Sequence, residues 1–330
     1  MKIVDLHCDT LDELLAQKLK GEHYNLYKRD GHLDIDRMLQ SGYLLQCFAA
    51  FVNMQKVESP YERGMELARL FQQLCAEYCP YIAPVYHYQD IAKHAEQGLM
   101  SAMLTIEEGG VLEGSLTHLK EFYEMGVRLI TLTWNHPNEI GYPGCLEKVS
   151  VPELPMGWKV TGEYPGLTKK GIEIVETMQE KGIIVDVSHL SDAGFWDVAA
   201  ITKKPFVASH SNARSVCGHK RNLSDAQIRT IAERGGVIGL NFAADFLEDQ
   251  PGEVCLGSFV RHIQHIIKVG GEDVIALGSD FDGITTNPAM PHAGVLPDLF
   301  ETMVQKGIAP SVIDKMKGQN ALRMMKEVIR

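Results

Sequence analysis

The chain has 330 residues, of which 45% are hydrophobic and 23% are charged. These proportions are ordinary for a folded globular protein, and they exclude a chain that is disordered over most of its length. The formal net charge of −11 argues against nucleic acid or an anionic membrane surface as the main partner. A chain of this length can bury a large hydrophobic core within a single domain.

Cysteine usage and the first residues of the chain bear on its location. The seven cysteines include no CxxC pair, which is typical of free thiols in a reducing compartment. A strand-like run begins at Lys2, so we expect no signal peptide before it. No apolar run reaches the roughly 18 residues that span a bilayer. The sequence therefore predicts a cytoplasmic protein.

Eight short runs rich in β-branched residues predict strands. In chain order they are Ile3–Asp5, Leu44–Phe51, Ser101–Ile106, Leu129–Thr133, Ile183–Asp186, Phe206–Ala208, Val237–Leu240 and Val274–Leu277. Amphipathic stretches lie between them, and several open with serine or threonine, as helix N-caps do. These predicted helices are Ser59–Tyr78, Ser115–Glu124, Thr168–Lys181, Ser224–Glu233 and Ser258–Val269.

The alternation of strands and helices predicts a parallel sheet. Eight strands favour a closed (β/α)₈ barrel, the TIM barrel, with residues 1–330 forming one catalytic domain. A doubly wound open sheet would give a similar pattern and remains the alternative. The longest irregular stretch, 135–165, is dense in proline and glycine and follows the fourth predicted strand. Loops of this length in compact domains usually serve an active site.

Five groups of polar residues come directly after predicted strands. They read DLHCDT from residue 5, TIEEGG from 105, DVSH from 186, ASHS from 208 and GSDFDG from 278. In a barrel the carboxyl ends of all strands meet on one face, where catalytic side chains gather. The coincidence of five clusters with five strand ends therefore predicts an active site on that face.

Histidines and carboxylates in these clusters suit a metal site. His7 and Asp9 are two residues apart, so their side chains point the same way from an extended strand. His189, His210 and Asp280 would arrive from three other strand ends. Three histidines with several carboxylates match the ligands of zinc or a similar divalent ion.

A second ion requires a ligand that both ions share, and a carboxylate has two oxygens to offer. Glu107 follows the third predicted strand, between the two sets of ligands, and is the natural bridge. Strand alternation makes its neighbour Glu108 point away. Two divalent ions about 3.5–4 Å apart can generate a hydroxide and polarise a carbonyl. His262 and His265 could also pair on a helix face, but a structural role is the simpler interpretation.

These motifs resemble those of the membrane (renal) dipeptidase family, a binuclear zinc branch of the amidohydrolase-like barrels. The similarity runs nearly end to end and includes DLHCDT, IEEGG, VDVSH, SHSNARSVCGHKRN and GSDFDG. The resemblance implies a (β/α)₈ barrel, two zinc ions and hydrolysis of dipeptides, often with a D-configured second residue.

The resemblance also implies roles for individual residues. The implied metal ligands are His7, Asp9 and Glu107 for one ion and Glu107, His189 and His210 for the other. Asp280 would lie beside the bridging water, and Arg221 would hold the substrate carboxylate. Without the resemblance, Arg221 would be read as a surface residue in a basic patch with Arg214 and Lys220.

Two positions depart from the family pattern. Members often carry a catalytic histidine directly after TLT, where this chain has Trp134, and His136 is the candidate to stabilise the oxyanion in its place. The run Asn241–Phe246 lacks a tyrosine that helps to bind the substrate carboxylate. Both departures bear on substrate preference more than on the metal site.

The expected function is that of a metallo-dipeptidase in which a metal-bridging hydroxide attacks the peptide carbonyl and Asp280 transfers the proton. One alternative is another binuclear hydrolase acting on a cyclic amide, lactone or phosphoester, and a second is a barrel that binds metal or peptide without turnover. Arg221 favours a substrate with a free carboxylate, and Asp280 with Glu107 favours catalysis. The expected partner is a dipeptide; the oligomeric state stays open, a homodimer included.

Overall fold

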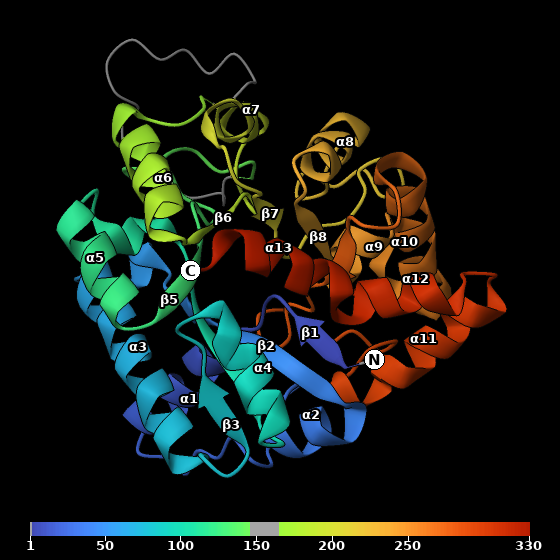
Figure 1. Cartoon of the computed structure of the whole chain (residues 1–330), viewed down its shortest axis with the longest axis horizontal. Coiled ribbons are helices and arrows are strands. Elements are labelled where there is room, and N and C mark those ends of the chain that lie inside the picture. Colours follow the sequence, from blue (N-terminus) through green and yellow to red (C-terminus); the bar gives the residue numbers. More distant parts are fainter. Residues whose placement is uncertain (1, 146–164) are drawn as a thin grey trace.

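The computed structural model describes residues 2–145 and 165–330, and Figure 1 shows their strands surrounded by helices. Within these ranges all strands join one sheet, and every pairing between strands is parallel. The strands are β1 (Ile3–Asp5), β2 (Tyr43–Phe51), β3 (Ile82–Pro84), β4 (Met100–Glu107), β5 (Val127–Thr131), β6 (Ile184–Asp186), β7 (Val207–Ala208), β8 (Val237–Leu240) and β9 (Ile275–Leu277).

One pairing closes the sheet into a barrel. Around the sheet the order is β2-β1-β9-β8-β7-β6-β5-β4, and β2 also pairs with β4, from Leu45 opposite Ser101 to Phe51 opposite Glu107. These eight strands therefore form a closed parallel barrel. The (β/α)₈ prediction is confirmed, and the open doubly wound sheet is excluded because it would leave β2 and β4 unpaired with each other.

The ninth strand, β3, was not predicted from the sequence. It pairs only with the first residues of β4, Met100 to Ala102, and so lies beside the barrel without closing it. Its three residues end in Pro84, which lacks the N–H that a central strand needs. A run of three residues that ends in proline is too short and too atypical to be recognised as a strand from the sequence.

Helices follow the strands and cover the outside of the barrel (Figure 1). They are α1 (Thr10–Leu19), α2 (Ile35–Ser41), α3 (Pro60–Glu77), α4 (Tyr88–Glu96), α5 (Leu116–Glu124), α6 (Lys169–Lys181), α7 (Asp192–Ile201), α8 (Asp225–Glu233), α9 (Ala244–Leu247), α10 (Leu256–Gly270), α11 (Leu296–Gln305), α12 (Pro310–Asp314) and α13 (Asn320–Val328). In the part of the chain described, none combines the length and apolarity needed to cross a membrane.

Serine and threonine N-caps begin four of the five predicted helices. The side chains of Ser59, Ser115, Thr168 and Ser224 each accept a hydrogen bond from the backbone N–H three residues on. The fifth prediction was wrong by two residues. Helix α10 begins at Leu256, because Ser258 bonds back to the backbone N–H of Cys255 from inside the first turn.

The hydrophobic core has two layers. Apolar side chains fill the barrel interior, among them Val4, Leu45 and Met103, and α13 packs against them with Met324 and Met325. Figure 1 shows α13 crossing the view in red. A larger layer fills the space between strands and surrounding helices. Because α13 packs on the interior at the amino-terminal ends of the strands, the polar residues at their carboxyl ends face the opposite side.

The irregular stretch predicted at 135–165 is described only to residue 145 and at residue 165. Its residues 146–164 lie outside the described part of the chain. The described portion leads from β5 along the carboxyl-terminal face, where Asn135 contacts His189.

Candidate metal centre

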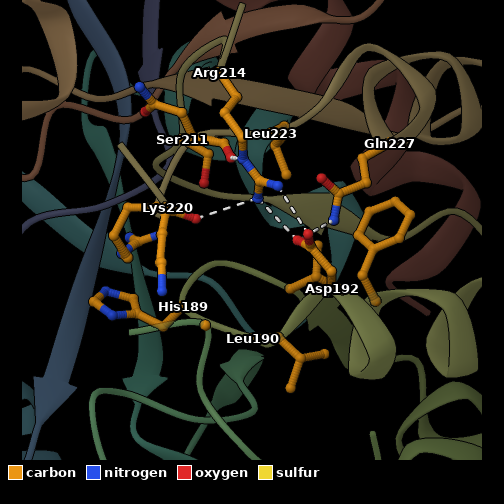
Figure 2. A pocket seen from close by; sticks show the side chains of 13 residues that line it. His189, Leu190, Asp192, Ser211, Arg214, Lys220, Leu223 and Gln227 are labelled. Carbon is orange, nitrogen blue, oxygen red and sulfur yellow. Dashed lines mark hydrogen bonds and ion pairs between the residues drawn. The ribbon is translucent and has the colours of Figure 1, made fainter. Parts of the chain in front are cut away.

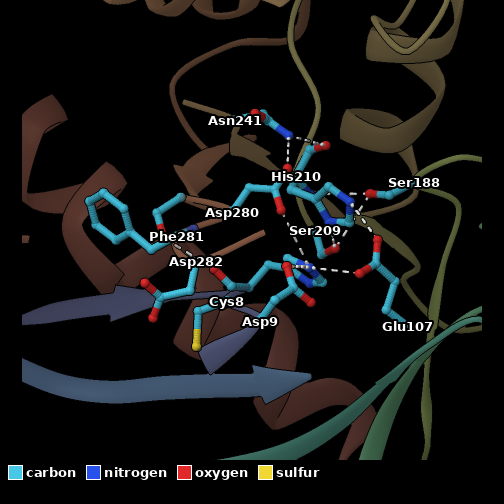
Figure 3. A network of polar contacts seen from close by, with 12 residues as sticks. Cys8, Asp9, Glu107, Ser188, Ser209, His210, Asn241, Asp280, Phe281 and Asp282 are labelled. Atoms are coloured by element: carbon cyan, nitrogen blue, oxygen red, sulfur yellow. Dashed lines mark hydrogen bonds and ion pairs between the residues drawn. The ribbon is translucent and has the colours of Figure 1, made fainter. Parts of the chain in front are cut away.

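All the predicted ligands meet at the carboxyl-terminal face of the barrel. His7 and Asp9 follow β1, and Glu107 is the last residue of β4. His189 and His210 follow β6 and β7. Three overlapping groups have ligand atoms within 4.8 Å of one another, and they are His7, Asp9 and Glu107; Glu107, His189 and His210; and His7, His210 and Asp280. Figure 3 shows Asp9, Glu107, His210 and Asp280 turned toward a common centre.

Glu107 faces histidines with both of its carboxylate oxygens. Its Oε1 lies 3.0 Å from His189 Nε2 and 3.5 Å from His210 Nε2. Its Oε2 lies 3.4 Å from His7 Nε2. The two ring nitrogens of His189 and His210 are themselves only 3.0 Å apart. This is the arrangement required of a carboxylate shared by two ions.

Unsatisfied buried atoms test whether these residues fit a metal. Both ring nitrogens of His7 and the Oδ1 atom of Asp9 are buried and have no hydrogen-bond partner within residues 2–145 and 165–330. Asp9 Oδ2 and Asp280 Oδ1 lie 3.4 and 3.7 Å from His7 Nε2. Buried polar atoms without partners destabilise a fold by about 1–3 kcal/mol each, whereas a divalent cation would satisfy Asp9 Oδ1 and one of the two nitrogens of His7. The donor set, imidazole nitrogens with carboxylate oxygens, suits zinc.

The buried carboxylates of the centre would be stabilised by a positive charge. Burial and the charge of Glu107 raise the pKa of Asp9 well above its ordinary value. Burial opposes a charge on His7, but Asp9 and Glu107 outweigh it and raise the pKa of that imidazole well above its usual range. Burial and the charge of Arg221 lower the pKa of His189 to about 3, so this ring stays neutral and its lone pair is available.

The loop after β9 places Asp280 against the ligands. Its Oδ2 atom accepts a hydrogen bond of 2.8 Å from Asn241 Nδ2, which leaves Oδ1 facing the centre. Gly283 allows the loop to approach, since a Cβ there would stand 1.9 Å from Asp9 Oδ2 and 2.8 Å from Asp280 Oδ1. The second glycine of the GSDFDG motif is therefore required by contact with two carboxylates.

A small cavity adjoins His189 (Figure 2), and Arg221 is among the residues that line it. Arg221 is 6% exposed, so the interpretation as a surface residue was wrong. Its guanidinium donates to the carbonyl of His210 at 3.3 Å and has no carboxylate partner among the described residues. Arg214 differs, since it forms a two-pronged pair with Asp192 at 2.8 Å per contact. A buried guanidinium without a counter-ion calls for an anionic ligand group.

The residues around Trp134 occupy the edge of the centre. The Trp134 ring lies 6.4 Å from that of His189, and Asn135 Oδ1 lies 3.1 Å from His189 Nδ1. His136 is buried one layer back, with its Nδ1 3.2 Å from Gln55 Nε2 and its ring 5.5 Å from Trp134. The contact of Asn135 with a ligand was missed from the sequence, because asparagine in a proline-rich loop reads first as a turn residue.

Three acidic or imidazole side chains expected to lie outside the ligand set do so. Glu108 accepts hydrogen bonds from the backbone N–H groups of Gly110 at 2.7 Å and Trp134 at 3.0 Å, and burial raises its pKa to about 7. His262 bonds the backbone through both ring nitrogens. His265 bonds Asp225 at 2.7 Å. Glu108 therefore holds the loop that carries Trp134, and the two helix histidines are structural.

A closed parallel barrel with histidines and carboxylates gathered at its strand ends is the architecture of the metal-dependent barrel hydrolases. Over residues 1–330 the chain matches the membrane dipeptidase family, peptidase family M19, and it belongs to this family. The resemblance drawn from the motifs is confirmed. The family also defines the chain as an enzyme of the dipeptidase class, which counts against a barrel that only binds.

Relatives and solved structures agree with this assignment. The chain is 37% identical over 248 residues to an uncharacterized Klebsiella pneumoniae protein from the pqqA 5′ region, covering 72% of this chain and 86% of the relative. It is 30% identical over 347 residues to an uncharacterized Schizosaccharomyces pombe dipeptidase, covering 99% and 80%. A Rhodobacter sphaeroides metallopeptidase bound to a phosphinate mimic of L-Ala-D-Ala superposes with a TM-score of 0.87 at 26% identity, covering 99% of each chain. A dipeptidase of family M19 gives 0.87 at 27% identity, covering 100% and 99%.

Proposed function

We propose that this protein is a zinc-dependent dipeptidase that holds two metal ions. His7, Asp9 and Glu107 would hold one ion, and Glu107, His189 and His210 the other. The observation that carries the proposal is the position of Glu107, whose two oxygens face separate histidines at 3.0 and 3.4 Å. Bound there, two divalent ions supply Lewis acidity toward a peptide carbonyl and toward water.

Asp280 is proposed as the group that moves the proton. Its Oδ2 atom is held by Asn241, so Oδ1 is the oxygen that can accept a proton from water and return it to the leaving amine. The side chain is 11% exposed and reaches into the centre from the loop after β9. A positioned acid–base group of this kind accelerates a reaction by about 100- to 10,000-fold.

Arg221 is proposed to restrict the enzyme to dipeptides. Its buried guanidinium and His189 line the same cavity, so a carboxylate held by Arg221 would lie a fixed distance from the metal ligands. A guanidinium offers parallel donors that match a carboxylate. The free carboxylate would then have to follow the scissile bond by one residue. Longer peptides, which place an amide at that point, would leave Arg221 buried and unpaired.

Two finer assignments belong to the same proposal. The Rhodobacter sphaeroides structure with its L-Ala-D-Ala mimic supports acceptance of a D-configured second residue. His136 is proposed to stabilise the oxyanion in place of the histidine that Trp134 replaces. Its ring lies 5.5 Å from that of Trp134, which in turn lies 6.4 Å from the ring of His189.

The test combines metal analysis with a substrate screen. Protein purified without chelator is expected to contain close to two divalent ions per chain, with zinc predominant. Matched L,L and L,D dipeptides should be hydrolysed, and the corresponding tripeptides should not. One ion per chain with full activity would contradict the binuclear centre. If no dipeptide is hydrolysed but a lactone or phosphoester is, the dipeptidase assignment is wrong and the protein is another hydrolase of the same fold.

A further inference from the structure

The ring nitrogen of His210 that faces away from the centre has a partner of its own. His210 Nδ1 lies 2.7 Å from the hydroxyl oxygen of Ser209, and that oxygen lies 2.5 Å from Asp186 Oδ2. All three side chains are fully buried. Figure 3 shows Ser209 beside His210.

The fold brings these residues together from neighbouring strands. Asp186 is the last residue of β6, Ser209 follows directly after β7, and the two strands pair through Asp186 and Val207. Thr131, the last residue of β5, reaches the same carboxylate from the other side, with its Oγ1 2.6 Å from Asp186 Oδ2. The link from Asp186 through Ser209 to His210 thus depends on three adjacent strand ends.

The surroundings of Asp186 fix its ionisation state. Its Oδ2 atom accepts from the hydroxyls of Thr131 and Ser209, and its Oδ1 atom accepts from the backbone N–H groups of Ser188 at 3.0 Å and Ser209 at 2.8 Å. These four donors fill the four lone-pair sites of an ionised carboxylate. An ionised carboxylate can only accept hydrogen bonds.

The direction of each hydrogen bond follows from that state. Since Asp186 has no proton to give, the Ser209 hydroxyl must donate to it. The Ser209 oxygen is then left to accept, so the proton between Ser209 and His210 belongs to His210 Nδ1. The lone pair of the imidazole must consequently lie on Nε2, the atom that faces Glu107 and His189.

We propose that Asp186 and Ser209 form a positioning relay that fixes the tautomer and ring orientation of His210 for metal binding. This inference rests on the proposed function, in which His210 is a ligand. The relay is particular to His210. His189 instead meets Asn135 at its Nδ1 atom, and His7 Nδ1 has no hydrogen-bond partner in the part of the chain that the structure describes. Outer partners that orient ligand histidines typically change metal affinity by about 10- to 100-fold when removed.

The test compares Ser209→Ala with Ser188→Ala. Ser188 is buried beside Ser209, 3.4 Å away, but its hydroxyl accepts from the backbone N–H of His210 and does not touch the ring. Zinc affinity of the metal-free protein would be measured by competition with a chromogenic chelator. Ser209→Ala should weaken one of the two bound ions by about 10- to 100-fold, and Ser188→Ala should change affinity much less.

A spectroscopic measurement separates positioning from general packing. Nitrogen-15 imidazole shifts of the metal-free protein, assigned with His210→Ala, should show the Nδ1–H tautomer for His210 in the wild type and in Ser188→Ala. Ser209→Ala should show a mixture of tautomers. Equal losses of affinity in both serine variants, or an unchanged tautomer in Ser209→Ala, would overturn the relay.

The same experiment distinguishes the relay from the metal centre on which it rests. Loss of one ion in His210→Ala, together with wild-type affinity in Ser209→Ala, would overturn the relay alone. Wild-type affinity in both variants would overturn the metal centre and the relay with it.

Discussion

Substitution of Asp280 by asparagine isolates proton transfer from the rest of the site. The backbone at Asp280 has a φ of 63°, a left-handed conformation that asparagine tolerates and alanine does not. Asn241 cannot flip to meet the new side chain, because its Oδ1 atom already accepts from the backbone N–H of Ala243 at 2.7 Å. The new amide must therefore turn its oxygen toward Asn241 Nδ2, in the place of Asp280 Oδ2.

That orientation decides the size of the effect. The nitrogen of the new amide takes the place of Asp280 Oδ1, 3.7 Å from His7 Nε2, and it cannot accept a proton. Shape and hydrogen bonding are otherwise retained, so the fold and the five proposed ligands stay in place. We expect kcat to fall by about 100- to 10,000-fold, which corresponds to about 2.7–5.5 kcal/mol in activation free energy.

The assay measures kcat and KM on one dipeptide, together with metal content and melting temperature. Asp280→Asn should retain wild-type metal content and stability while losing turnover. Asn241→Ala is the matched comparison, since it releases Asp280 without changing its charge and should cost much less. An Asp280→Asn enzyme with wild-type kcat would remove Asp280 from proton transfer, and loss of metal from that variant would make it a ligand instead.

Three further substitutions test separate parts of the centre. Glu107→Gln should abolish activity and lower the metal content measured by elemental analysis. Glu108→Gln should keep its metals and lose about 1–3 kcal/mol of unfolding free energy, because an amide NH₂ would face buried donors. The reverse pattern would show that the strand register is wrong. Arg221→Ala should lower kcat/KM on a free dipeptide by an amount that corresponds to about 2–5 kcal/mol in activation free energy, and it should erase the preference for the acid over its amide. If the wild type cleaves the acid and the amide equally, Arg221 does not recognise a carboxylate. His136→Ala should lower kcat more than it raises KM, and wild-type kinetics would leave the oxyanion to other groups.

The barrel strands could be predicted because each is a buried run flanked by turn residues and alternating with a helix. β3 could not, since its three residues end in a proline and it only borders the barrel. The start of α10 was misplaced because Ser258 looks like an N-cap, although it bonds backward to Cys255 from inside the helix. A serine at the N-cap and a serine inside the first turn both form hydrogen bonds with nearby backbone N–H groups, and only the backbone conformation distinguishes the two positions.

The structure brings the predicted ligands together where the position of a residue along its strand decides the direction of its side chain. The side chains that could not be assigned from the sequence act through other residues. Asp186 was quoted in a motif without a role, although it ends a strand as the ligands do. Asn135 and Ser209 carry no charge and no metal affinity, so only their distances to ligand histidines show what they do. The burial of Arg221 depends equally on tertiary packing, which a basic sequence such as HKRN does not reveal.

The alternation of β4 connects core and site in a single strand. Met103 points into the barrel interior with Leu45 and Leu129, and two steps of that alternation bring Glu107 to the same side at the strand end. Glu108, one residue on, leaves the strand with a φ of 90° and binds the neighbouring loop. A slip of one residue in the pairing with β2 would exchange the two carboxylates and turn the interior methionine outward, toward the surrounding helices. The same apolar packing that fixes the barrel register thus holds Glu107 between the histidines.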